Sequence, residues 1–337
     1  MQLKKSTLTH YSLGELNQYM LTIQHLISAT AASMVVIHHG QIVNEWYSGS
    51  HGSSSESRTV DARSRFNVAS VRKTYLGAAI SLAIYEGKIK SIDDPVTEYI
   101  ADYAPELLSH TTLRHLLTHT HGLRGHNQRL FPPGTEWKYN NAGVNLLIQM
   151  VRNVFDQPLA QVMQERFFVP YGFTETGWVQ EEQDHLVWLH EAYSSDQGSE
   201  ANLFASTREL AYWGYLHLTK GMYKGKQIIP SAVFNTCSSI ATPAALNQTI
   251  TRNGFFWWVQ DIPRPTSELG DQLPVGSYQS LGLYGNAVLV IPAYHLVAVR
   301  MLNQTEPNPP TYDYIHDIQT FGNLVCQYGA AVNSKSS

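Results

Sequence analysis

A serine and a lysine lie three residues apart at the start of an apolar stretch of the chain. They are Ser70 and Lys73, within the segment FNVASVRK at 66–73. On a helix, residues three apart share a face, so the Lys73 amine can reach the Ser70 hydroxyl. A serine attacks a carbonyl only when a neighbouring base takes its proton, and a lysine whose pKa is lowered by burial or nearby charge can be that base. The pair therefore predicts an activated nucleophile, although a helix N-cap followed by a solvated lysine has the same pattern.

A tyrosine and an asparagine further along could complete this site. The segment PGTEWKYNN at 133–141 has the composition of a turn that leads into a helix over 142–154. Tyr139 and Asn141 are therefore expected on the loop just before that helix. A tyrosine there can act as a second proton carrier beside the lysine. A buried aromatic ring and a helix-capping asparagine are the structural alternative, and Asn141 could cap the helix and serve the site at once.

Ser-x-x-Lys followed by Tyr-x-Asn resembles the serine β-lactamase and penicillin-binding-protein superfamily. The likeness is to its class C-like branch, which holds β-lactamases, DD-peptidases, esterases and small-amide hydrolases. Further segments similar to this branch follow in order, with His121 where serine is usual: DDPVTEYI at 93–100, TTLRHLLTHTHGL at 111–123, FVPYGFTET at 168–176 and ASTRELA at 205–211. This resemblance implies a β-lactamase-related serine hydrolase that acts through an acyl-enzyme.

The same resemblance implies a role for each of the four residues. Ser70 would be the nucleophile, Lys73 and Tyr139 the general base and acid, and Asn141 would orient Lys73 and contact the substrate. Which of Lys73 and Tyr139 is the acylation base stays open. No cofactor is implied.

The third family motif departs from the usual pattern. Relatives carry Lys-Thr-Gly or His-x-Gly on a strand that lines the cleft, whereas the matching segment here is SLGLYGN at 280–286, with Ser280 in place of the cation. Gly282 would let the strand backbone approach the substrate. By resemblance, the N–H groups of Leu283 and Ser70 would form the oxyanion hole. Because serine is a poor partner for a carboxylate, we expect small uncharged esters or amides rather than penicillins.

Aromatic residues near this motif are candidates for the walls of the substrate pocket. Tyr278 and Tyr284 are expected to line the acyl or leaving-group pocket. The run FFWW at 255–258 is expected on a strand, where alternation would turn one pair to the core and the other toward the cleft.

Two alternatives to this function stay open. Within enzymes, the chain could be a β-lactamase or a D-Ala-D-Ala carboxypeptidase that anchors its substrate differently. Outside enzymes, it could be a non-catalytic homologue that sequesters peptidoglycan-like ligands, although the presence of Ser70, Lys73 and Tyr139 together disfavours this.

A metal site is the remaining chemical hypothesis, raised by His115 and His119 at a spacing of four. A zincin helix needs a glutamate directly after the first histidine, and here that residue is Leu116. We therefore expect an amphipathic helix whose histidines are hydrogen-bonded or solvated, and no metal.

The elements that must position these residues predict an α+β fold, and the family resemblance implies that this fold is β-lactamase/transpeptidase-like. Hydrophobic periodicity predicts a helix over 13–27, strands at 33–37 and 41–47 with a turn at 38–40, and a helix from Ser70 to about Tyr85. The stretch 91–234 is expected to be mainly helical. Strands at 254–260, 284–291 and 296–302 and a helix over 312–328 follow. These patterns indicate an antiparallel β-sheet flanked by helices and built from both chain ends, with an inserted helical subdomain.

This order divides one catalytic domain into a sheet subdomain, 1–90 plus 250–337, and a mainly helical subdomain, 91–249. We expect the site at their junction, because ligand pockets favour such clefts.

Composition agrees with a soluble enzyme. The 337 residues are 43% hydrophobic and 15% charged, with a net charge of −4. The chain has no dense Lys/Arg run, so nucleic acid or an anionic membrane is not the expected partner; a small ester, amide or peptide is. With no signal-like or membrane-spanning apolar run, we expect a cytoplasmic protein, or an exported one if a signal peptide has been removed. Cys237 and Cys326 are isolated and are expected to be ordinary buried thiols.

Overall fold

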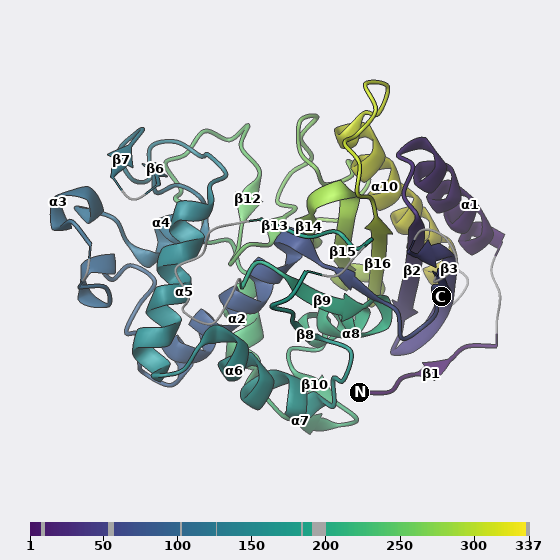
Figure 1. Cartoon of the computed structure of the whole chain (residues 1–337), viewed down its shortest axis with the longest axis horizontal. Helices are drawn as coiled ribbons and strands as arrows, with labels where there is room; N and C mark the ends of the chain where they lie inside the picture. Colours follow the sequence, from purple (N-terminus) through teal and green to yellow (C-terminus); the bar gives the residue numbers. More distant parts are fainter. Residues whose placement is uncertain are drawn as a thin grey trace.

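One β-sheet that draws its strands from both ends of the chain lies at the centre of the molecule (Figure 1). The computed structural model describes residues 1–7, 11–52, 57–101, 103–125, 127–182, 185–190 and 200–334. The strands of this sheet are β1 (Lys4–Lys5), β2 (Ala31–His38), β3 (Gln41–His51), β4 (Arg58–Thr59), β12 (Arg252–Asn253), β13 (Trp258–Val259), β14 (Tyr278–Gly282), β15 (Asn286–Ile291) and β16 (Leu296–Asn303).

These strands run in the order β1-β3-β2-β16-β15-β14-β13-β12, with β4 paired to β3. Every pair is antiparallel except β1 with β3. The pairing of β2 with β16 joins the two chain ends in mid-sheet. The predicted α+β fold with a sheet built from both chain ends is confirmed.

The two central strands from the C-terminal part bury both of their faces. All residues of β15 and β16 are buried, and their side chains alternate between two separate hydrophobic cores. Val288 and Val290 enter one core, whereas Leu289 and Ile291 enter the other. Because both faces are covered, these strands contain apolar runs, at 287–291 and 296–299, rather than an alternation of apolar and polar residues.

Helices cover the sheet on both sides. The helices are α1 (Tyr11–Leu26), α2 (Lys73–Tyr85), α3 (Pro105–Leu108), α4 (Leu113–Leu117), α5 (Asn141–Phe155), α6 (Leu159–Met163), α7 (Val169–Tyr171), α8 (Thr207–Leu218), α9 (Ser231–Ser238) and α10 (Tyr314–Asn333). The first and last of them, α1 and α10, lie side by side on one face (Figure 1), while α8 packs against β2, β15 and β16 on the other.

The helix α2 is enclosed by protein on almost every side. Its residues from Lys73 to Ala83 are all buried, and it packs against α5 and α9. A helix that is apolar all round belongs inside a protein rather than on its surface. The consequence is that Lys73, at its first position, is held in the interior.

A buried ion pair ties β16 to α10. Arg300 donates from Nη1 and Nη2 to the two carboxylate oxygens of Asp317, at 2.8 and 2.5 Å, and from Nε to the carbonyl of Gly285 at 2.7 Å. Asp317 also accepts from the hydroxyls of Tyr312 and Tyr19, at 2.6 and 2.8 Å. Burial alone would raise the pKa of Asp317, but the Arg300 charge and these hydrogen bonds hold it below its usual value.

The predicted bounds of two strands are wrong, because a non-glycine residue in each segment adopts a left-handed backbone conformation. Phe256 has φ +63° and breaks the predicted strand 254–260, leaving only β13. Tyr284 has φ +62° in the tight turn 283–285, so the strand expected from 284 begins at Asn286. Turns of this kind favour glycine, so aromatic residues give no sign of them in the sequence.

The stretch expected to be mainly helical also contains short strands. Among them, β8 (Gly177–Trp178) and β9 (Leu203–Ser206) form a three-stranded sheet with β5 (Arg65–Asn67), and β6 (Leu123–Arg124) pairs with β7 (Gln128–Arg129), as does β10 (Met222–Tyr223) with β11 (Lys226–Gln227). The helix α8 lies within the predicted helical subdomain, 91–249, yet packs on the central sheet. The boundaries proposed for the two subdomains stay a prediction.

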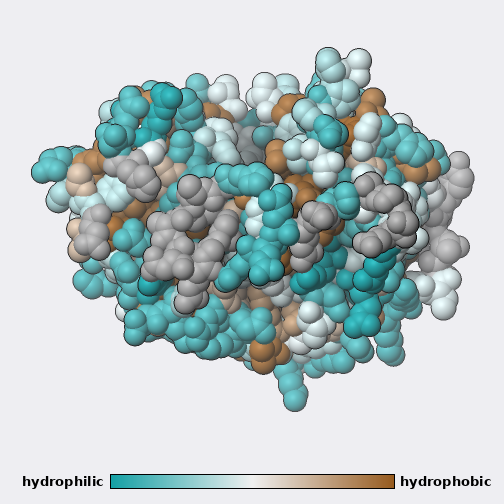
Figure 2. Space-filling view, in the orientation of Figure 1, coloured by the Kyte–Doolittle hydropathy of each residue, from teal (hydrophilic) through white to brown (hydrophobic). Residues whose placement is uncertain are grey.

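Of the helices in the described residues, none is both long enough and apolar enough to cross a bilayer. On the face shown in Figure 2, hydrophilic side chains dominate and hydrophobic ones occur in small separate groups. Cys237 and Cys326 are buried thiols that form no disulfide.

Candidate active site

A strained turn presents Ser70 at the entrance to α2. The backbone N–H of Val68 donates to the carbonyl of Leu203 on β9, at 2.9 Å, and that of Ala69 donates to the Asn67 side chain, at 2.8 Å. Ala69 has φ +49°, which costs a non-glycine residue on the order of 1 kcal/mol. Ser70 follows in the single 3-10 turn Ala69–Arg72, half-buried. The small sheet that the sequence did not predict therefore positions the serine.

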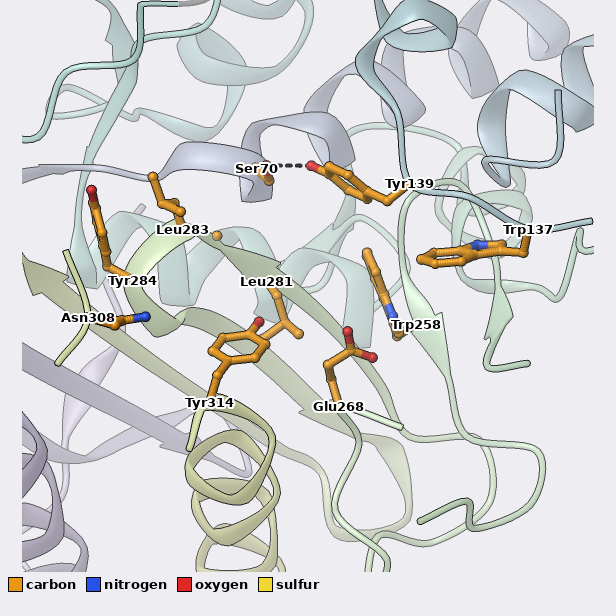
Figure 3. Close-up of a pocket in the computed structure, with 11 residues that line it drawn as sticks. Ser70, Trp137, Tyr139, Trp258, Glu268, Leu281, Leu283, Tyr284, Asn308 and Tyr314 are labelled. Atoms are coloured by element: carbon orange, nitrogen blue, oxygen red, sulfur yellow. Dashed lines mark hydrogen bonds between the residues drawn. The ribbon is translucent and has the colours of Figure 1, made fainter. Parts of the chain in front are cut away.

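Three polar atoms of the predicted site meet within hydrogen-bond distance of one another. Lys73 Nζ lies 2.8 Å from Ser70 Oγ and 2.5 Å from the Tyr139 hydroxyl. The Tyr139 hydroxyl lies 2.6 Å from Ser70 Oγ, and Figure 3 shows this contact. Lys73 is only 2% exposed, whereas Tyr139 is 38% exposed. Lys73 therefore lies in the interior, and Tyr139 lies at the surface.

The asparagine that caps α5 is Asn140 rather than Asn141. The Asn140 backbone is extended, with φ −159°, and its side-chain oxygen accepts from the N–H of Ala142 at 2.7 Å. An N-cap residue needs this non-helical backbone, and the predicted cap lies one residue later, already in the helix. Asn141 is half-buried in the first turn of α5.

Strand β14 passes close to the serine turn because its last residue is a glycine. A Cβ on Gly282 would lie 2.5 Å from the carbonyl oxygen of Val68, which is closer than a Cβ atom comes to an atom of another residue. The contact brings Leu283 and Tyr284, in the turn after β14, to the same pocket as Ser70. Ser280 also lies on β14, but it is 1% exposed and is not among the described residues that line this pocket.

A pocket of about 390 Å³ opens beside Ser70 (Figure 3). Its described lining is mostly aromatic and apolar, and Glu268 is the one charged side chain in it. The lining residues are Ser70, Trp137, Tyr139, Trp258, Glu268, Leu281, Gly282, Leu283, Tyr284, Asn308 and Tyr314. In Figure 3, Ser70 and Tyr139 lie at one end of the pocket, and Glu268 and Tyr314 lie at the other.

Of the two histidines considered as metal ligands, His115 caps a helix and His119 is buried. His115 accepts at Nδ1 from the backbone N–H of Thr112, at 3.1 Å, and so caps α4. His119 is 1% exposed, and its Nδ1 accepts from the backbone N–H of Asn140 at 3.5 Å. Its ring centroid lies 4.6 Å from that of Tyr139. Burial, and then the Lys73 charge, lower the pKa of His119 well below its usual value, so the ring is neutral at pH 7. In the part of the chain that the structure describes, no three His, Cys, Asp or Glu residues are grouped so as to hold a metal.

Five of the eleven described lining residues were not predicted from the sequence. Trp137, Glu268, Asn308 and Tyr314 come from separate loops or helix ends and carry no motif. Trp258 was expected either in the core or in the cleft, and it lines the pocket. Leu281 could have been inferred from strand alternation once β14 was assigned.

Tyr278 does not take its expected place in that wall. It is buried, and its ring packs edge-on against Trp257, with centroids 5.2 Å apart.

Comparisons with known proteins cover most of the chain. The beta-lactamase family model matches residues 22–319. An uncharacterized protein of Alkalihalophilus pseudofirmus is 41% identical over 313 residues, which are 89% of this chain and 91% of that protein. A class C beta-lactamase solved with cefoxitin matches at a TM-score of 0.72 with 15% identity, over 94% of this chain and 98% of that chain. A hydrolase with promiscuous acyltransferase activity matches at 0.69 with 17% identity, over 92% and 98%. At these identities the two structures show the fold.

Proposed function

The chain belongs to the beta-lactamase family, and on that premise we propose that it is a serine hydrolase that cleaves an ester or amide bond through an acyl-enzyme on Ser70. The observation that carries the proposal is the mutual contact of Ser70 Oγ, Lys73 Nζ and the Tyr139 hydroxyl at the end of a substrate-sized pocket. A serine nucleophile is activated by a base within hydrogen-bond reach, and Ser70 has two candidates for that base.

In the proposed acylation, Ser70 Oγ forms a bond to the substrate carbonyl carbon while its proton passes to Lys73 or Tyr139. The bond from the carbonyl carbon to the leaving alcohol or amine then breaks. The leaving group receives the proton that came from Ser70 through Tyr139, the more exposed of the two carriers. A water molecule then attacks the acyl carbon and gives a proton to the same side chains. The bond between Ser70 Oγ and the acyl carbon breaks, the acid leaves, and that proton restores the Ser70 hydroxyl.

Two backbone N–H groups, of Ser70 and Leu283, are proposed to hold the oxyanion. The proposal is supported by the close approach of Gly282 to Val68 and by the place of Leu283 in the pocket wall. Removal of a single oxyanion donor costs other hydrolases roughly 100- to 1,000-fold in kcat.

The pocket favours uncharged or cationic substrates over penicillins. Among the described residues that line it, none is Lys, Arg or His, and Glu268 would repel a carboxylate. This agrees with Ser280 in place of the family's cation. The β-lactamase and carboxypeptidase alternatives would need a cationic anchor for the substrate carboxylate, and the described residues of the wall include none.

A fluorophosphonate probe tests the nucleophile. We expect the probe to label Ser70 in wild type, with no label and no turnover of p-nitrophenyl acetate in Ser70→Ala. Ser109→Ala, at an exposed serine outside the pocket, is the matched control and should behave as wild type. Peptide mapping that places the label on another serine would overturn the mechanism, and a chain that retains ligands but is never labelled would be the non-catalytic homologue. Nitrocefin hydrolysed with a higher kcat/KM than the ester would favour the β-lactamase alternative.

A further inference from the structure

We propose that Glu268 and the aromatic rings around it form a subsite for an organic ammonium group of the substrate. This inference rests on the proposed function, because it assigns a substrate class to the same pocket. The proposed substrates are esters or amides that carry a positive charge at a distance from the scissile bond.

The backbone of Glu268, rather than an ion pair, fixes it at the pocket. Gln279 on β14 donates from Nε2 to the Glu268 carbonyl at 3.1 Å, which holds the loop against the sheet. The ion pairs found among the described residues all involve other carboxylates. Within that part of the chain, the carboxyl group of Glu268 has no cationic partner and lies in the pocket wall.

The rings around Glu268 suit a cation as well as an apolar group. Trp258 and Tyr314 lie on either side of it in Figure 3, Trp137 lies beyond Trp258, and Tyr139 lies next to Ser70. An ammonium group is attracted to the face of an aromatic ring by the ring's quadrupole, most strongly to tryptophan. A carboxylate surrounded by several rings therefore attracts a cation both by its own negative charge and through the quadrupoles of the rings.

The pKa shifts of Glu268 and Tyr314 agree with a carboxylate that has no cation beside it among the described residues. Burial raises the pKa of Glu268 above its usual value, while hydrogen bonds from its own backbone and from the Trp258 side chain oppose this shift. The pKa of Tyr314 is raised by burial and then by the Glu268 charge. Glu268 is half-buried. A carboxylate that has lost part of its hydration and has no cation beside it is unfavourable, and a ligand ammonium would favour its ionised form.

Choline and 3,3-dimethyl-1-butanol test the subsite directly, because the two molecules share one shape and differ by the charge. Binding to the full chain is measured by calorimetry or by quenching of tryptophan fluorescence. We expect wild type to bind choline at least about tenfold tighter than the neutral alcohol. In Glu268→Gln this preference should fall to about twofold or less. Glu15→Gln removes an equal charge from the exposed face of α1 and should keep the wild-type preference.

The acetate esters of the same two alcohols carry the test into turnover. The ratio of their kcat/KM values should favour the choline ester in wild type and Glu15→Gln, and should fall at least about fivefold in Glu268→Gln. Equal binding of the two alcohols by wild type, or a preference that Glu268→Gln retains in full, would overturn the subsite. Choline binding does not require Ser70 to react. An unlabelled Ser70 therefore contradicts the proposed function alone, and an absent choline preference contradicts the subsite alone.

Discussion

The buried pair of Arg300 and Asp317 allows a stability prediction with a worked magnitude. Arg300→Met removes the guanidinium but keeps much of the side-chain volume. Among the described residues, the buried Asp317 carboxylate then keeps two side-chain partners, the hydroxyls of Tyr19 and Tyr312. Breaking a buried pair by removing one member costs about 3–5 kcal/mol. At roughly 2.1 cal/mol/K per residue, the 337 residues give an unfolding entropy of about 0.7 kcal/mol/K. The variant should therefore melt about 4–7 °C below wild type.

Differential scanning calorimetry at a single scan rate measures this change. The matched control is the double variant Arg300→Met with Asp317→Leu, which removes the orphaned charge and should recover most of the lost melting temperature. Arg300 also holds the carbonyl of Gly285, in the turn that carries Leu283, so kcat of the single variant should fall as well. A melting temperature within about 1 °C of wild type, or a double variant less stable than the single one, would show that the pair is not the stabilising contact described here.

Four further outcomes are expected. Tyr139→Phe, which removes the hydroxyl shared by Ser70 and Lys73, should lower kcat about 100- to 10,000-fold with little change in melting temperature, and near-wild-type turnover would exclude Tyr139 as a proton carrier. Gly282→Ala should lose about 1–3 kcal/mol in urea unfolding, because its methyl group meets the Val68 carbonyl. Since the folded pKa of Asp317 is depressed, its contribution to stability is present above its ordinary pKa near 3.8 and lost as pH falls through the folded value, so the advantage of wild type over Asp317→Asn in urea should shrink below about pH 4. Turnover should survive prolonged chelation, and a loss that zinc reverses would contradict a site built from serine, lysine and tyrosine.

The parts of the site that the sequence predicted are those set by local geometry. The spacing of Ser70 and Lys73 along one turn fixes their contact almost regardless of the rest of the fold. The apolar runs likewise predicted the central strands, and the helical periodicity predicted the two terminal helices, to within a few residues. Family resemblance added Tyr139, whose contact with the pair depends on a loop packing against α2.

The parts that escaped prediction depend on contacts between distant segments or on unusual backbone. Glu268, Tyr314 and Trp258 become neighbours only when the last third of the chain has folded, and each alone is an ordinary residue in its segment. The left-handed turns at Ala69 and Tyr284 place non-glycine residues where sequence rules expect glycine. Short strands such as β9 have too few residues to show a period.

The pairing of β2 with β16 also has a consequence for synthesis on the ribosome. Val35 pairs with Val299, so about 260 residues must be translated after the first strand before its partner exists. At about 5–20 residues per second, this takes on the order of 13–50 s. During that interval the hairpin of β2 and β3 emerges with an apolar face and an unpaired edge, both of which invite aggregation. The nascent chain is therefore expected to depend on a chaperone for this hairpin until the last strand leaves the exit tunnel.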